Sequence, residues 1–269
     1  MTGAAAASPS TDLGLRLAVI ASVVAVIGMN VAANALPLFG RATGAISDAY
    51  PTPFTPAGYV FSIWGVIYLG QIVYAVWQAT PAGRADPRTA SVAPWVIASG
   101  AMNVSWLILW HAELVAWAVL PIVALLSCVA VVYEKLRAAP SKGDPAADSA
   151  GVVRWTAQIP FAIYFGWLSV ATIANVAVAG VALGWQGAPF GAEAWAGLMI
   201  LVATLLGVRM LQARAEPAFA LVLIWAFVGI AVEVGLPSVL AFTAAVASAL
   251  LAGGIAGRLV RRGGRRAAR

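Results

Sequence analysis

The stretch "NVSWLILWH", residues 103–111, places an asparagine, two tryptophans and the chain's single histidine inside a long apolar run. Asn103 and Trp106 are three residues apart and Trp110 follows four residues later, so a helix would carry all three side chains on one face. An amide and two indoles on one face of an apolar helix indicate either a helix–helix contact or the wall of a binding cavity.

The composition of the whole chain decides which solvent surrounds this helix. Of the 269 residues, 62% are hydrophobic and 10% are charged, and the mean hydropathy is +0.91. Soluble domains contain about 25% charged residues. A chain with so few charges cannot cover a water-facing surface, which excludes a soluble protein and predicts an all-α integral membrane protein.

Eight segments are long and apolar enough to cross a bilayer, which takes about 20 apolar residues. They cover residues 15–38, 56–79, 91–111, 114–135, 157–183, 194–212, 217–234 and 238–260. Between the third and the fourth lies only "WHAE", residues 110–113, which predicts a tight turn at the membrane surface with Glu113 exposed.

Basic residues predict the orientation of these spans. With the N-terminus inside, fifteen of the sixteen lysines and arginines face the cytoplasm, six of them in the tail "GRLVRRGGRRAAR", and only Arg41 lies outside. Both termini are therefore expected in the cytoplasm, in a multi-pass protein of the bacterial inner membrane. The tail fits anionic lipid beside a helix end, and no nucleic-acid partner is expected.

The N-terminus has an alternative interpretation. "VAANALP", residues 31–37, resembles the small-residue cleavage site of a signal peptide. Arg16 is the only basic residue before it, and the apolar stretch is longer than a typical signal core. These features favour a first helix that is retained.

The sequence contains little catalytic or metal-binding chemistry. It has no phosphate-binding glycine loop, zinc-type histidine pair or nucleophile elbow. Cys128 is the only cysteine, which excludes an intrachain disulfide. Ionisable residues are almost absent from the spans, apart from Glu233 near an end, which argues against an ion-driven pump. The expectation is a protein that is not an enzyme, with no metal and no obligatory cofactor.

A second polar and aromatic stripe lies on the fifth span. Trp167, Ala171 and Asn175 are spaced by four residues, and the small Ala171 leaves room for a flat molecule. Either asparagine alone would most simply hydrogen-bond a neighbouring helix. Two stripes that each combine Asn with Trp favour a lined cavity.

Three motifs in order resemble a known family. They are "TPAGYVFSIWGVIYLG" at 55–70, "NVSW" at 103–106 and "WLSVATIAN" at 167–175. They resemble motifs of the TspO/MBR family, the translocator proteins also called tryptophan-rich sensory proteins. Departures include Pro56-Ala57 in place of paired prolines and Tyr59 in place of a usual tryptophan.

The resemblance implies a TspO-like five-helix transmembrane core over residues 1–185. Residues 186–260 would then form three additional transmembrane helices, and residues 261–269 a basic cytoplasmic tail. The family's pocket lies beneath the loop joining the first two helices, here residues 39–55, and binds planar hydrophobic molecules such as porphyrins. The implied ligand-binding residues are Tyr59, Phe61, Trp64, Tyr68, Asn103, Trp106, Trp110, Trp167, Ala171 and Asn175.

The implied function is a sensor or transporter that binds a porphyrin or haem, with a membrane carrier for another small or lipophilic solute as the alternative. Porphyrin breakdown through tryptophan radicals is a third hypothesis, and it lacks a dedicated acid, base or metal set. His111 would lie at the rim of the pocket, where a lone histidine is more often a hydrogen-bonded boundary residue than an iron ligand. The spacing of Gly253 and Gly257 is compatible with a homodimer.

Overall fold

The computed structural model describes residues 9–36, 40–138 and 150–267, and every regular element in these ranges is helical. Its long helices are α1 (Pro9–Ala35), α3 (Ile63–Ala79), α5 (Pro87–His111), α6 (Val115–Leu136), α8 (Ile159–Ala182), α9 (Ala192–Arg214), α10 (Pro217–Val234) and α11 (Val239–Ala267). Its short helical segments are α2 (Thr43–Asp48), the 3-10 turn η1 (Gly58–Ser62), α4 (Pro81–Ala85), α7 (Ala150–Val153) and the π-turn η3 (Arg154–Gln158).

Eight described helices are long and apolar enough to cross a membrane, which confirms the eight predicted segments and the all-α integral membrane fold. The fifth of these spans begins at Gly151, earlier than the predicted residue 157, because the π-turn η3 carries the helix on without a break. The predicted tight turn after α5 is present. Glu113 adopts a left-handed backbone conformation there (φ 57°) and its exposed carboxylate pairs with Arg41 at 3.4 Å.

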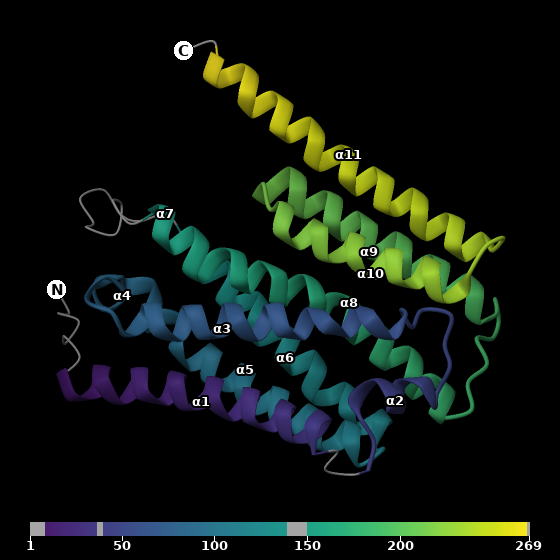
Figure 1. Ribbon diagram of the computed structural model, residues 1–269, viewed down its shortest axis with the longest axis horizontal. Coiled ribbons are helices and arrows are strands. Elements are labelled where there is room, and N and C mark those ends of the chain that lie inside the picture. Colours follow the sequence, from purple (N-terminus) through teal and green to yellow (C-terminus); the bar gives the residue numbers. More distant parts are fainter. Residues whose placement is uncertain (1–8, 37–39, 139–149, 268–269) are drawn as a thin grey trace.

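The long helices run alternately in opposite directions, with α9 and α10 beside α8 and α11 on the far side of α9 and α10 (Figure 1). Apolar side chains from α1, α3, α5, α6 and α8 make one buried core, whereas a second core is formed mainly by α9, α10 and α11. We call the first group the core unit and the second the C-terminal unit. Residue 185, the expected end of the five-helix core, lies in the loop between α8 and α9.

Helix α8 belongs to both units because its two faces pack against different partners. Ala162 and Val170 of α8 lie in the second core, while Phe161 and Trp167 lie in the first. The approach of α10 is close at Gly166, where an added Cβ would lie 3.1 Å from Cβ of Val222. Small residues allow this kind of contact between membrane helices.

The alternating directions give the bundle two distinct ends. The "cover end" carries the cover segment, residues 43–62, which comprises α2, η1 and the chain between them. The opposite "basic end" carries α4, the end of α6 and the start of α10 (Figure 1). Among the residues whose side chains are described, the lysines and arginines lie toward the basic end, with the exception of Arg41.

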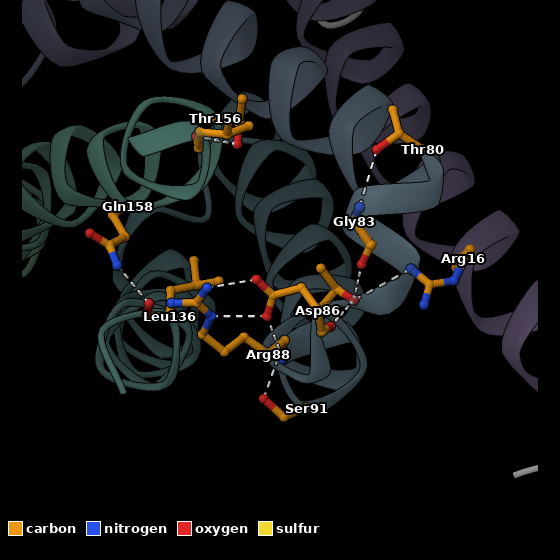
Figure 2. Close-up of polar contacts among 11 residues, drawn as sticks. Arg16, Thr80, Gly83, Asp86, Arg88, Ser91, Leu136, Thr156 and Gln158 are labelled. Carbon is orange, nitrogen blue, oxygen red and sulfur yellow. Dashed lines mark hydrogen bonds and ion pairs between the residues drawn. The ribbon is translucent and has the colours of Figure 1, made fainter. Parts of the chain in front are cut away.

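At the basic end, buried polar side chains join helices that are distant in sequence (Figure 2). The Arg16 guanidinium donates to the carbonyl oxygens of Gln78 (Nη1, 2.6 Å) and Arg84 (Nη2, 3.2 Å). Gln78 in turn donates through Nε2 to the Arg16 carbonyl at 3.3 Å. Arg16 is 5% exposed. It therefore fixes α1 against the α3–α4 corner through hydrogen bonds to backbone acceptors.

Two carboxylates at this end are also buried and paired. Asp86 caps α5, and its carboxylate accepts hydrogen bonds from Arg88. The donors are the Arg88 backbone N–H (2.9 Å) and the Arg88 guanidinium (2.9 and 2.6 Å). Glu216, between α9 and α10, is fully buried and accepts from Arg137 at 3.0 Å and from Arg154 at 2.6 and 2.8 Å. Glu216 thus ties the C-terminal unit to the core unit.

Candidate functional site

A small cavity lies at the cover end between the cover segment, α3, α5 and α8. Its volume is about 30 Å³. It is lined by Thr43, Ser47, Pro56, Phe61, Trp64, Trp106, Trp110, Trp167, Val170, Ala171, Ala174, Asn175 and Val178. We call it the tryptophan cavity, because four of its lining residues are tryptophans.

The indole rings that line the cavity pack against one another. Trp64 lies at the centre, with its ring centroid 6.0 Å from that of Trp106 in a stacked arrangement and 6.1 Å from that of Trp167 in an edge-on one. Trp106 stacks on Trp110 at 5.8 Å. The remaining volume would hold two or three water molecules, each of which needs roughly 10–15 Å³. A planar ligand would enter only if the cover segment or the rings moved.

Several polar atoms at this cavity have no hydrogen-bond partner among the described residues. They are Nε1 of Trp106, Nε1 of Trp167 and both side-chain amide atoms of Asn175. These three residues are at most 5% exposed. A buried polar group without a partner costs about 1–3 kcal/mol. Four such atoms around one cavity therefore provide donors and an acceptor that a polar substituent of a ligand could satisfy.

Unpaired polar atoms also occur elsewhere in the described chain, as at the hydroxyl groups of Tyr74 and Tyr133. Neither of these residues lines the tryptophan cavity. Three residues with such atoms line the tryptophan cavity, and one of them is an amide. A neutral amide can both donate and accept hydrogen bonds, which suits a ligand of mixed polarity.

Seven of the ten predicted site residues line the tryptophan cavity: Phe61, Trp64, Trp106, Trp110, Trp167, Ala171 and Asn175. The helical spacing explains this result, because residues four apart on α5 and on α8 share a face. Asn103 and Tyr68 lie close by but outside the lining. Tyr68 stacks on Trp64 at 5.5 Å and supports that ring from behind.

Asn103 is fully buried and hydrogen-bonds within the protein. Its Nδ2 donates to the Tyr164 hydroxyl at 3.0 Å, and its Oδ1 accepts from Nδ2 of Asn30 at 3.3 Å. This side chain connects α1, α5 and α8 one turn away from the cavity. The role that asparagine commonly has between membrane helices accounts for its position.

Tyr59 points away from the cavity. It is 44% exposed and packs edge-to-face on Trp225 of α10, with ring centroids 5.3 Å apart. Residue 59 lies in the 3-10 turn η1, where three residues complete a turn. Its side chain therefore points in a different direction from the one that it would have in an α-helix. The structure does not bring Tyr59 to the site.

His111 is buried and both of its ring nitrogens face protein atoms. Nδ1 lies 2.9 Å from the Leu107 carbonyl oxygen and Nε2 lies 3.3 Å from the Thr43 hydroxyl. The indole N–H of Trp110 donates to the Thr43 carbonyl at 3.1 Å. These contacts fix α2 to the end of α5, and they agree with a hydrogen-bonded boundary residue. In the described part of the chain no three His, Cys, Asp or Glu residues gather as metal ligands would.

Sequence reasoning missed the part of the lining that comes from α2. Thr43 and Ser47 are buried and face the cavity from a helix of six residues. The surrounding "RATGAISDAY" carries glycine and polar residues, which is typical of a loop, and six residues are too few to show a helical period. Their role depends on tertiary packing that a local pattern does not reveal.

A larger apolar groove of about 670 Å³ lies on the next face of α8. Its walls come from the cover segment at Pro51–Phe54, from α8 at 172–181, and from the start of α9, where Trp195 lies. The groove and the tryptophan cavity share the cover segment and are separated by α8. No charged side chain lines the groove among the described residues.

The fold and cavity define a class: a multi-pass α-helical membrane protein with an aromatic cavity closed by the segment between its first two spans. A family model described as TSPO-like protein matches residues 16–257. This match covers most of the chain, which therefore belongs to the TSPO-like family, and it continues through α9 and α10 into α11. No curated protein and no solved structure matches the chain.

Proposed function

We propose that this protein binds a planar apolar molecule with polar substituents, such as a porphyrin, in the tryptophan cavity, and acts as a sensor or transporter for it. The observation that carries the proposal is the gathering of stacked indoles around four unpaired polar atoms. Indole faces stack on flat rings, and buried donors become favourable when a ligand acceptor pairs with them. The TSPO-like family membership supports ligand binding in a membrane protein.

Binding requires the closed cavity to open, because its present volume is far below the 300–1,000 Å³ that is typical of small-molecule pockets. The neighbouring indoles would separate, and the ligand would replace ring–ring contacts by ring–ligand contacts. The chain's own residues then fix the ligand: Trp64 and Trp106 by stacking, and Asn175 by hydrogen bonds to a ring substituent.

The test is tryptophan-fluorescence quenching of the detergent-purified protein titrated with protoporphyrin IX. Trp106→Ala and Trp167→Ala each remove a buried indole from the cavity, whereas the control Trp117→Ala removes an indole that is 64% exposed on α6. We expect saturable quenching, and an affinity at least about tenfold weaker in each cavity variant, since buried aromatic anchors contribute about 2 kcal/mol or more. Equal, non-saturable quenching in all variants would show partitioning into the micelle and reject the site.

We further propose that the basic end faces the cytoplasm of a bacterial cell, so that both termini are cytoplasmic and the cover segment faces outward. Basic residues concentrate on the cytoplasmic side of membrane proteins. The test is labelling in intact cells of a single cysteine placed at residue 41 or residue 84, in a Cys128→Ser background. A membrane-impermeant maleimide should react at residue 41 only.

We propose binding rather than catalysis, with the ligand and the surrounding lipid as partners and no obligatory cofactor. Chromatography of the ligand after prolonged incubation in light and air tests this proposal. The ligand should elute unchanged.

A second candidate function, a carrier for a small or lipophilic solute, is favoured by the 670 Å³ groove between α8 and α9. Val176 is half exposed and lines the groove, so Val176→Trp would fill it without disturbing the buried core. If the protein is a carrier that uses the groove, proteoliposomes should show saturable efflux of coproporphyrin. Val176→Trp should abolish this efflux. Efflux equal to that of empty liposomes would reject transport of this porphyrin through the groove.

A further inference from the structure

We infer that α10 positions the cover of the tryptophan cavity through Gly229 and Trp225, so that the C-terminal unit sets how readily the cavity opens. The effect on ligand entry rests on the proposed function. The mechanical link between α10 and the cover segment is a property of the ligand-free protein.

Two hydrogen bonds hold the backbone of the cover segment on α10. The Ala57 N–H donates to the Gly229 carbonyl oxygen at 3.1 Å, and the Trp225 indole N–H donates to the Val60 carbonyl oxygen at 3.0 Å. The second bond joins residues that are 165 positions apart in sequence. The ring of Tyr59 packs on Trp225 beside them. The half of the cover that includes η1 is therefore attached to the C-terminal unit.

Gly229 fits this contact because it lacks a side chain. A Cβ added there would lie 2.1 Å from Cγ2 of Val60 and 3.1 Å from Cβ of Pro56. Val60 is fully buried and Pro56 lines the tryptophan cavity. Any side chain at residue 229 must displace Val60, and Pro56 would shift with it. A movement of α10 is thus transmitted to the cavity wall.

The other half of the cover segment is attached to the core unit instead. Thr43 of α2 hydrogen-bonds to Asn34, Trp110 and His111, on α1 and α5. The cover thus has two anchors on two different units, and a relative movement of those units would separate them. Because the closed cavity holds only about 30 Å³, ligand binding draws on the open population. Loosening either anchor raises that population and speeds association.

Gly229→Ala tests the α10 anchor, with Gly253→Ala on α11 as the matched control. A Cβ added at residue 253 would have no heavy atom within 4 Å, so the same substitution meets open space there. Hydrogen exchange of the ligand-free protein is measured first, by mass spectrometry of peptides covering residues 56–62. We expect faster exchange in Gly229→Ala and not in Gly253→Ala, since the added Cβ pushes the cover segment away from α10 and lengthens the bond from the Ala57 N–H to the carbonyl oxygen of residue 229. Trp225→Phe keeps an aromatic ring but removes the indole N–H, and should act in the same direction with a smaller effect.

Stopped-flow quenching by protoporphyrin IX is measured next. Loss of one neutral hydrogen bond corresponds to about a threefold to tenfold change in an equilibrium. We therefore expect association about threefold to tenfold faster in Gly229→Ala, and unchanged in Gly253→Ala. Unchanged exchange at residues 56–62 in both Gly229→Ala and Trp225→Phe would overturn the inference, as would an equal increase in Gly253→Ala. Faster exchange in a protein that binds no porphyrin in any form would support the link to α10 and reject the proposed function.

Discussion

The charged groups buried at the basic end and the polar groups buried around the tryptophan cavity differ in their pairing. At the basic end, Asp86 and Glu216 each pair with arginine, and Arg16 donates to backbone carbonyls. At the cover end, the Asn175 amide and the indole N–H groups of Trp106 and Trp167 lack partners among the described residues. The comparison teaches that burial alone does not mark a functional residue. Paired groups hold the helices together, whereas unpaired groups around a cavity are available to a ligand.

The largest effect is expected where a buried pair is broken. Glu216→Ala leaves the guanidinium groups of Arg137 and Arg154 without their carboxylate, and breaking a buried ion pair costs about 3–5 kcal/mol. Glu134→Ala is the matched control, because its pair with Arg214 is nearly half exposed on both sides. An exposed pair contributes about 0–1 kcal/mol. Unfolding in mixed micelles measures both, and similar losses in the two variants would contradict the distinction.

A smaller loss is expected at the core-unit anchor of the cover segment. His111→Ala removes the ring that contacts the Thr43 hydroxyl and the Leu107 carbonyl oxygen, and should lower the free energy of unfolding by about 1–3 kcal/mol. Haem titration should give the same Soret band in this variant as in the wild type, because both ring nitrogens face protein atoms. A shifted Soret band in the variant would instead identify His111 as an iron ligand.

The smallest effect is expected at the exposed pair of the cover end. Arg41 and Glu113 are 49% and 45% exposed and lie 3.4 Å apart. Glu113→Gln should change the free energy of unfolding by less than about 0.5 kcal/mol, because exposed ion pairs are weak and screened by salt. A decrease in the free energy of unfolding of more than about 2 kcal/mol would contradict this expectation. It would mean that the pair of Arg41 and Glu113 holds the cover segment closed.

The eight spans could be predicted because insertion into a membrane depends on the hydropathy of each segment, which is a local property of the sequence. The cavity wall on α5 and α8 could be predicted because spacing on a regular helix fixes a face, as it does for Trp167, Ala171 and Asn175. Tyr59 was implied by the family resemblance and not by helical spacing, and η1 directs its ring to Trp225 on α10.

Features that depend on contacts between distant segments could not be predicted. Glu216 follows a helix end in a sequence that looks exposed, yet arginines from two other segments enclose it. Thr43 and Ser47 reach the cavity from a helix too short to carry a periodic signal. Asn103 and Asn175 have the same residue type and similar surroundings in sequence, and only the structure shows that one is paired and the other is not.

These two asparagines provide the most direct test of the central claim. Asn103→Leu and Asn175→Leu make the same substitution at two buried sites on different helices, and their free energies of unfolding without ligand can be compared in one micelle system. We predict that Asn103→Leu is destabilised by about 2–3 kcal/mol, because Tyr164 and Asn30 lose their partner. Asn175→Leu should be unchanged or more stable by up to about 1 kcal/mol, because an unpaired amide is replaced by an apolar group, while its affinity for protoporphyrin IX falls. Equal destabilisation of the two variants would contradict the claim that the polar groups of the tryptophan cavity are held for a ligand.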